Sequence, residues 1–150
     1  MDKKTLTRNA VILALYVLLI NVNPVGWGPI QFRIGEMLSV IPFFNRKYIP
    51  ALVVGGGLAN INSPLGLVDI AVGVSCAAIT YAITSKVKNP WLGGLIFSAV
   101  AGILVAAELL AVYNAPFLLS FLSVGGSQVV ILSLGVLLFS GPLNRLVVEE

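Results

Sequence analysis

Charged side chains are too scarce in this chain to cover a surface in contact with water. They make up 10% of the residues and apolar ones make up 58%, whereas a soluble domain carries about a quarter charged residues. The apolar residues form long runs, and most of the charges stand in the short turns between the runs. We therefore expect an integral membrane protein in which residues 1–150 form a single membrane domain.

Prolines, glycines and charged turns divide the chain into six apolar segments. A membrane-spanning helix needs about 20 apolar residues, and somewhat fewer where neighbouring helices bury it. The first segment follows Lys3, Lys4 and Arg8, as in a signal peptide, but we interpret it as a span because no soluble domain follows it. The sequence predicts an all-α bundle of six transmembrane helices at residues 6–22, 33–44, 48–60, 68–84, 91–112 and 117–140.

The distribution of lysine and arginine favours six spans and predicts their orientation. With six spans, eight of the nine cations fall on one face of the membrane. Only Arg33, at the rim of the first loop on the opposite face, departs from this pattern. Because cytoplasmic loops carry an excess of Lys and Arg, we expect a cell-membrane protein with both termini in the cytoplasm. The net charge of +3 then reflects orientation, and we expect no nucleic-acid partner.

Polar side chains from five of the predicted spans fall at one depth, in the outer half of the bundle. They are Arg33, Glu36, Asn60, Asp69, Glu108 and Gln128. An ionisable group inside a membrane is costly unless it is paired or meets water, so this cluster predicts a binding site. The alternative is a structural ion-pair network, for example between Arg33 and either Glu108 or Asp69.

The charges of this cluster indicate the kind of ligand that it would bind. One cation against three carboxylates leaves two negative charges in excess if all four groups ionise. Carboxylates accept paired N–H donors well, so the cluster favours a ligand with an amidine or guanine-like edge. Trp27, Phe32 and Tyr113 lie near the same level and are candidates for stacking on a flat ring, although aromatic residues also anchor helices at the membrane interface.

Small residues predict two places where helices approach closely. Gly55, Gly56 and Gly57 stand in the middle of the third predicted span, where each glycine costs roughly 1 kcal/mol relative to alanine. They therefore indicate close helix contact or local unwinding. Ala10 and Ala14 lie on one face of the first span and would let another helix approach in lipid. That helix could belong to a partner protein or to this chain itself.

The absence of several residue types and motifs excludes many kinds of chemistry. The chain has no histidine, and its single cysteine, Cys76, lies in an apolar run. These facts exclude His-based general base catalysis, disulfide bonds and thiolate metal sites. The glycines at positions 55–57 lack the Gly-Lys-Ser/Thr that completes a phosphate-binding loop. We therefore expect neither an enzyme nor a metal site, and transport against a gradient would need an ion or partner subunits.

Three short patterns resemble those of the QueT family of queuosine-precursor transporters, the substrate-binding S components of energy-coupling factor (ECF) transporters. They are Phe-Arg-x-x-Glu at residues 32–36, Ala-Asn at residues 59–60, and Asp-x-x-x-Gly at residues 69–73. The resemblance covers most of the chain. It implies a six-helix S-component fold that captures its ligand near the outer face of the membrane and topples to deliver it.

The same resemblance implies a ligand, partners and residue roles. The ligand would be a 7-deazaguanine base, with Glu36 or Glu108 taking its paired N–H edge and Asn60 bonding a ring carbonyl or nitrogen. Asp69 or Arg33 would order the pocket, and residues 24–31 would act as a lid with Trp27 stacking on the base. Ala10 and Ala14 match the small-residue motif that docks S components on a transmembrane coupling subunit. Two cytoplasmic ATPases would use the ATP, so no cofactor is expected in this chain.

Other functions remain open at this stage. The same machinery could carry another vitamin or base. A stand-alone carrier would couple transport to protons through Asp69 or Glu108. An intramembrane enzyme is disfavoured because the predicted spans contain no Ser-Lys pair at helical spacing and the chain has no DxxD metal motif. A purely structural subunit would leave the clustered charges unexplained.

Overall fold

All the regular structure that is described in this chain is helical. The computed structural model describes residues 2–23 and 31–148, which contain no strand. In chain order the elements are α1 (Lys3–Asn21), the 3-10 helix η1 (Ile34–Val40), α2 (Ile41–Phe44), the 3-10 helix η2 (Arg46–Tyr48), α3 (Ile49–Leu58), α4 (Leu67–Ile83), the 3-10 helix η3 (Thr84–Lys86), α5 (Pro90–Tyr113), α6 (Phe117–Ser140) and α7 (Asn144–Val148). The all-α prediction is confirmed.

Four helices are long and apolar enough to cross a membrane: α1, α4 continued by η3, α5 and α6. The second and third predicted spans form shorter pieces, with η1 and α2 covering Ile34–Phe44 and α3 only 10 residues long. At 1.5 Å per residue, α3 measures about 15 Å, or half of a hydrocarbon core of about 30 Å. The fold thus supports a membrane protein, and the count of six spans stays a prediction.

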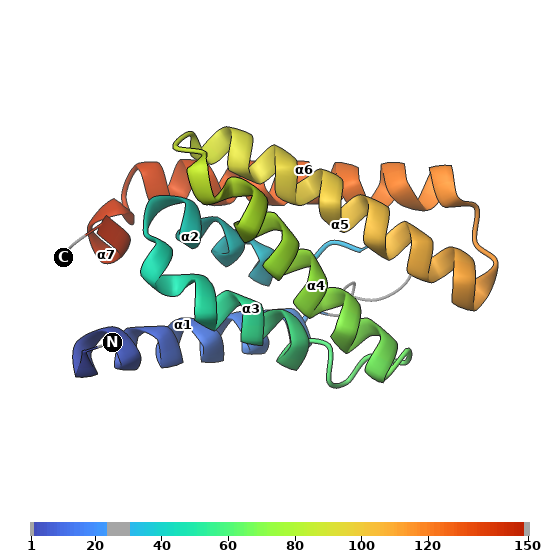
Figure 1. The fold of residues 1–150 in the computed structure, drawn as a ribbon, viewed down its shortest axis with the longest axis horizontal. Coiled ribbons are helices and arrows are strands. Elements are labelled where there is room, and N and C mark those ends of the chain that lie inside the picture. Colours follow the sequence, from blue (N-terminus) through green and yellow to red (C-terminus); the bar gives the residue numbers. More distant parts are fainter. Residues whose placement is uncertain (1, 24–30, 149–150) are drawn as a thin grey trace.

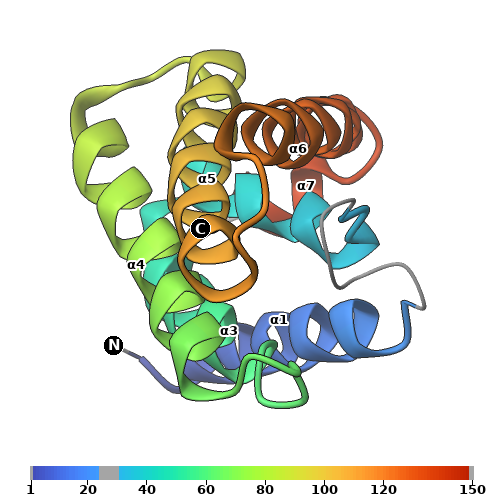
Figure 2. The ribbon, with the colours of Figure 1, turned by 90° about the vertical axis from the view of Figure 1, so that its right-hand side faces the viewer.

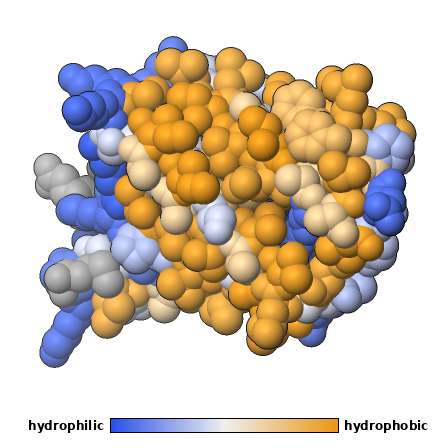
Figure 3. Space-filling view, turned by 45° about the vertical axis from the view of Figure 1, so that its right-hand side comes forward, coloured by the Kyte–Doolittle hydropathy of each residue, from blue (hydrophilic) through white to orange (hydrophobic). Residues whose placement is uncertain are grey.

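The chain nevertheless runs back and forth along the long axis of the bundle (Figure 1). The two terminal segments lie at the same end, together with the turn between α2 and α3 and the turn between α4 and α5. Those two turns carry Arg46, Lys47, Lys86 and Lys88. The space-filling view shows hydrophilic residues gathered at this end and an apolar flank beside them (Figure 3). This is the division between polar end and lipid-facing flank that a membrane-spanning bundle requires.

Six elements form a closed ring. Contacts run from α1 to α3, then to α4, α5, α6 and η1, and from η1 back to α1. The contacts place η1 between α6 and α1, and the end-on view shows the helices arranged around the ring (Figure 2). The core of the ring includes Tyr16, Val40, Leu52, Phe97 and Leu132. The outer faces carry exposed leucines such as Leu18, Leu118 and Leu137, as expected of helices that contact lipid.

Capping residues explain where the long helices begin and end. Asp2 precedes α1, and its side chain accepts a hydrogen bond from the Thr5 N–H at 3.0 Å, which lowers the pKa of Asp2. Asn89 caps α5 in the same way, and Pro90 takes the first position of that helix. At the other end Asn114 has a φ of 52°, in the left-handed region that often terminates helices.

Glycines bring α3 close to two other helices, as the triple glycine predicted. A Cβ added to Gly56 would lie 2.6 Å from the carbonyl oxygen of Gly73 in α4, and one added to Gly55 would lie 2.9 Å from the ring of Tyr16 in α1. Side chains at these positions would push the helices apart. The helical geometry of residues 49–58 is unbroken, so close contact and not unwinding accounts for the three glycines.

The segment η1 is held between α1 and α6. A Cβ on Gly35 would lie 3.0 Å from the carbonyl oxygen of Tyr16, and one on Gly135 would lie 2.5 Å from the carbonyl oxygen of Met37. Seven residues is long for a 3-10 helix, which seldom exceeds three or four residues on its own. We attribute the length of η1 to this packing on both sides.

The C-terminal segment folds back as a short helix, α7. Its Val147 is buried, and its carbonyl oxygen accepts a hydrogen bond from Nδ2 of Asn45 at 3.0 Å. Asn144 Nδ2 donates to the carbonyl oxygen of Phe139. These contacts close the end of the bundle where the terminal segments lie.

Candidate functional site

A cavity of about 30 Å³ lies inside the ring and is lined by residues from every element of it. This volume admits water but is too small for an aromatic base. The lining residues are Tyr16, Gln31, Arg33, Glu36, Gly56, Asn60, Asp69, Val72, Gly73, Cys76, Ala77, Phe97, Ala101, Val105 and Gln128.

Two walls of the cavity are formed by residues that recur at helix spacing on α4 and on α5. On α4 the lining positions 69, 72, 73, 76 and 77 recur every three or four residues and so share one face. On α5 they are Phe97, Ala101 and Val105, one per turn. Glu108 continues the α5 series one turn later, and its residue is 5% exposed. The small residues Gly73, Ala77 and Ala101 leave room between these walls.

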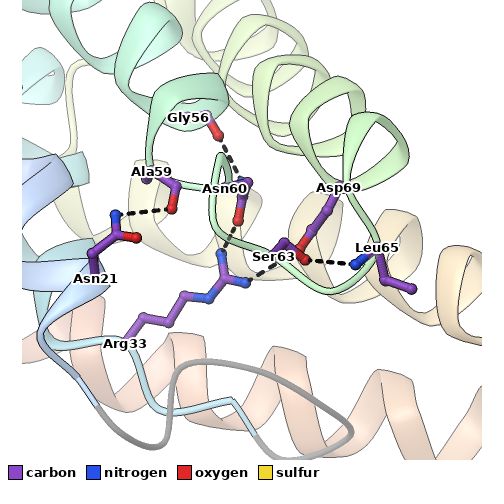
Figure 4. A network of polar contacts seen from close by, with 8 residues as sticks. All are labelled: Asn21, Arg33, Gly56, Ala59, Asn60, Ser63, Leu65 and Asp69. Carbon is purple, nitrogen blue, oxygen red and sulfur yellow. Dashed lines mark hydrogen bonds and ion pairs between the residues drawn. The ribbon is translucent and has the colours of Figure 1, made fainter.

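Arg33 links two of the other polar residues (Figure 4). Its Nη1 donates to Oδ1 of Asn60 at 3.0 Å, and its Nη2 lies 3.9 Å from Oδ2 of Asp69. Asn60 in turn donates through Nδ2 to the carbonyl oxygen of Gly56 at 2.7 Å. All three side chains are buried. Charged and amide groups from the segment before η1, the end of α3 and the first turn of α4 are thus fixed relative to one another.

The backbone around Asn60 is held from α1. Asn21 Nδ2 donates to the carbonyl oxygen of Ala59 at 3.1 Å, and Asn62 Nδ2 donates to Oδ1 of Asn21 at 2.8 Å. In the turn that leads to α4, the N–H of Leu65 donates to Oγ of Ser63. These bonds tie the segment between α3 and α4 to the end of α1, so the position of Asn60 is set by two neighbouring elements.

Glu36 belongs to a second polar group on the η1 side of the cavity. Ser39 Oγ donates to Oε2 of Glu36 at 2.8 Å, and the Tyr81 hydroxyl donates to the carbonyl oxygen of Ser39 at 3.0 Å. Tyr81 comes from α4 and is 3% exposed. One carboxyl oxygen of Glu36 is therefore engaged within the protein.

Two buried residues of the predicted site have acceptor atoms that no donor of the described residues reaches. Both carboxyl oxygens of Glu108 and Oε1 of Gln128 lack a hydrogen-bond partner among the described residues. A buried polar atom without a partner typically costs about 1–3 kcal/mol, and more if it is charged. The α5 and α6 side of the site therefore holds acceptors, whereas the α3 and α4 side is an internally bonded network.

The structure brings most of the residues singled out in the sequence into one place. Arg33, Glu36, Asn60, Asp69 and Gln128 line the cavity, and Glu108 is buried on the same face of α5. The ion-pair alternative describes part of the cluster, because Arg33 pairs with Asp69. It does not describe Glu108 or Gln128.

Of the three aromatic residues predicted to stack on a flat ring, the two that the structure describes are not found in the lining of the cavity. Phe32 and Tyr113 are both exposed, which fits the interfacial alternative. Trp27 and most of the proposed lid, residues 24–30, lie outside the described residues.

Several residues of the site gave no signal in the sequence. Gln31, Ser39 and Tyr81 are uncharged polar residues of kinds that occur throughout membrane helices, and Tyr16 and Cys76 lie in ordinary apolar runs. Tyr81 stands four residues after Ala77, so helix spacing alone would have placed it beside a lining residue of α4. Only the position of η1 shows that its hydroxyl reaches Ser39.

Ala10 and Ala14 face outward. Both residues are exposed on α1, on the side away from the buried Asn9, Tyr16 and Ile20. The exposure of both residues is compatible with contact to another helix, and the role of the pair stays a prediction. With regard to metals, no group of three or more His, Cys, Asp or Glu side chains able to hold an ion occurs in the described part of the chain.

By its fold and its site, this chain is a helical membrane protein with a buried polar cavity suited to a small polar molecule. Comparison with known proteins identifies the class more closely. The sequence profile of the QueT transporter family matches residues 6–141, and the chain belongs to this family. It is a transporter family, so the chain is not an enzyme.

One curated relative is similar over most of its length. The protein named queuosine precursor transporter QueT from Lactococcus lactis subsp. cremoris (strain MG1363) is 33% identical over 129 residues, which cover 75% of this chain and 76% of the relative. No solved structure matches this chain.

Proposed function

We propose that this protein captures a queuosine precursor, a 7-deazaguanine base, at the outer face of the cell membrane and delivers it inward as the S component of an ECF transporter. The name of the Lactococcus relative supports the substrate class. The observation that carries the proposal is the cavity enclosed by the ring, with three buried carboxylates and one buried guanidinium around it. Such a site suits a ligand that is rich in N–H donors.

Each polar residue has a role in this proposal. Glu36 or Glu108 takes the paired N–H edge of the base, since a carboxylate accepts two parallel N–H bonds. Arg33 and Asp69 order the pocket, which their pairing supports. Asn60 bonds a ring carbonyl or nitrogen through its second amide hydrogen, the first being used by Gly56. Trp27 stacks on the ring and residues 24–31 form the lid.

The cavity must widen when the base binds. Its volume of about 30 Å³ is close to that of a water molecule, whereas drug-sized ligands occupy pockets of about 300 Å³ or more. The structure therefore corresponds to a closed form of the cavity in this proposal. Separating α3 from α4 would be costly, because their backbones are tightly packed at the facing glycines. Widening should therefore cost less on the sides of the cavity where the contacts are polar and few.

Orientation and partners complete the proposal. The end that carries both termini and the basic turns faces the cytoplasm, in agreement with the positive-inside rule. The exposed Ala10 and Ala14 form the docking surface for a transmembrane coupling subunit, which works with two cytoplasmic ATPases. An exposed pair of small residues one turn apart lets a second helix approach closely in lipid.

Docking can be tested with matched substitutions. Ala14→Leu places a large side chain on the proposed surface, whereas Ala99→Leu does the same at an exposed position of α5. Co-purification with the coupling subunit and ATPases should fall with Ala14→Leu and persist with Ala99→Leu. Equal recovery of both complexes would contradict the docking surface.

Ligand binding is the central test. Isothermal titration of the purified protein with 7-deazaguanine bases should give saturable binding, and both Glu36→Gln and Asp69→Asn should weaken it. Unchanged affinity in both variants would place the site elsewhere. Mass spectrometry of the small molecule that co-purifies with the protein would show whether the ligand is instead another vitamin or base.

A second function is favoured by one observation. Glu108 is a buried carboxyl without a partner in the described part of the chain, which is also what a proton-coupled carrier requires. Such a carrier would accumulate the base in proteoliposomes under a proton gradient with no ATPase subunits present. The S component would do so only with its coupling subunit, ATPases and ATP.

A further inference from the structure

The polar groups around the cavity divide into those already engaged with one another and those that are available. Arg33, Asn60 and Asp69 are bonded together, and Glu36 accepts from Ser39. Among the described residues around the cavity, the fully buried acceptors left without a donor are the Glu108 carboxyl and Oε1 of Gln128. Glu108 is in α5 and Gln128 is in α6, and both are 5% exposed.

The register of α5 and α6 fixes how far apart these two acceptors lie. The helices are joined by a short turn and run in opposite directions. Gly102 of α5 and Gly125 of α6 lie at the same height along the two helices, because a Cβ added to Gly102 would lie 3.3 Å from Cα of Gly125. Glu108 stands six residues from Gly102 toward the turn, and Gln128 stands three residues from Gly125 away from it. The nine residues between their levels correspond to roughly 13 Å along the axis.

Both side chains reach into the interval between these levels. Side chains of a helix tilt toward its N-terminus, so Glu108 leans away from the turn and Gln128 leans toward it. Along α5 the interval is lined by Ala101 and Val105, on the face that Glu108 continues. Two acceptors therefore lie on the α5 and α6 side of the site, with Gln128 in the lining of the cavity and Glu108 one turn beyond the lining residue Val105. A flat fused-ring base with a hydrogen bond of about 2.9 Å at each end would fill such an interval.

We infer that the base lies along α5 with its paired N–H edge at Glu108 and its opposite end at Gln128, whose carbonyl selects ligands that carry a hydrogen-bond donor there. This rests on the proposed function and names, within that site, the residue that sets specificity. A carboxylate offers two oxygens to the ring N–H and the exocyclic amine of a guanine-like edge. The Gln128 side chain offers a single acceptor, which matches a single donor arm. An acceptor group in the same place would face the carbonyl oxygen or would require the Gln128 amide to turn over, so it should bind more weakly.

The experiment combines changes in the ligand with changes in the protein. Affinities are measured by isothermal titration of the full-length protein in detergent with three compounds. The first is 7-deazaguanine bearing an aminomethyl arm, the second has a nitrile in place of that arm, and the third lacks the exocyclic ring amine. The protein variants are Glu108→Gln and Gln128→Met. A coupling between a residue and a ligand group shows that the two interact.

The expected pattern is specific to the orientation. The unaltered protein should lose about ten-fold or more in affinity when either ligand group is changed, as for a hydrogen bond to a buried group. In Gln128→Met the penalty for the nitrile should largely disappear while the penalty for the missing ring amine persists. In Glu108→Gln the reverse should hold. Circular dichroism and thermal melting verify that the variants fold, with Glu108→Asp and Gln128→Asn as substitutes for a variant that does not.

Three results would overturn the inference, and they differ from one another. If Glu108→Gln couples to the arm and Gln128→Met to the ring amine, the base lies the other way round. If both penalties survive in both variants, neither residue contacts the ligand, and the proposed function stands without this orientation. If the unaltered protein binds none of the three compounds, the proposed function fails together with the inference.

Discussion

Asn60 has a central place among the polar side chains because it serves two neighbours at once. Its carbonyl oxygen accepts from Arg33 and its amide donates to the backbone of Gly56. The residue is 2% exposed, so its removal takes a hydrogen-bond partner from both neighbours inside the bundle. The guanidinium of Arg33 would keep Asp69 as a partner at 3.9 Å, a weaker contact than the hydrogen bond that it would lose.

We expect Asn60→Leu to destabilise the protein by about 1–3 kcal/mol, because it leaves buried donors and acceptors unpaired at nearly constant volume. The measurement is thermal or denaturant unfolding in detergent. Asn62→Ala is the control, since Asn62 makes an exposed hydrogen bond to Asn21 and should cost well under about 1 kcal/mol. Equal losses in the two variants would mean that the Arg33 network adds nothing to stability.

At this scale the sequence predicted which charged and amide residues gather, but not how they pair. Arg33, Glu36 and Asp69 stood out because charges are costly in lipid. Ser39 and Tyr81 carry no such cost and look like any other residue of an apolar run. Their bonds to Glu36 and to the η1 backbone depend on where α4 lies against η1, which no local pattern encodes.

Among the elements, α3 and α4 owe their closeness to facing glycines. Gly56 and Gly73 meet backbone to backbone, and a Cβ on Gly73 would also collide with Nδ2 of Asn60. The contact therefore positions the Asn60 side chain as well as the two helices. The sequence indicated close approach through its run of three glycines, but the partner glycine in α4 could not be identified without the register of the two helices.

Two glycine substitutions should have opposite effects. Gly73→Ala should destabilise the fold by about 1–3 kcal/mol, because the methyl group forces the backbones apart. Gly126→Ala has nothing within 4 Å of the added Cβ and lies inside α6. It should be neutral or stabilising by up to about 1 kcal/mol, through better helix propensity. Unfolding curves of the two variants under one set of conditions provide the comparison, and a destabilising Gly126→Ala would contradict the packing described here.

For the molecule as a whole, the bounds of the four long helices follow from hydropathy and capping residues within a few positions. The bounds of the two shorter apolar segments, residues 34–44 and 49–58, do not follow from the sequence, because these segments are too short to be certain spans and too apolar to be loops. Tertiary contacts settle their form. The packing of Gly35 on α1 and of Gly135 on η1 keeps residues 34–40 in a tight 3-10 helix, where the sequence predicted an ordinary transmembrane helix.

Thiol accessibility decides whether the passage through η1, α2 and α3 crosses the membrane. Cys76 is the single cysteine and is buried, so Cys76→Ser provides a background without reactive thiols. On that background we expect Asn62→Cys to react with an impermeant reagent in intact cells. Arg46→Cys and Lys88→Cys should react only after permeabilisation, because they lie at the end of the bundle that holds the termini. Labelling of Arg46→Cys in intact cells, with Lys88→Cys still protected, would mean that residues 31–66 enter and leave on one side, and four helices would then be the only spans.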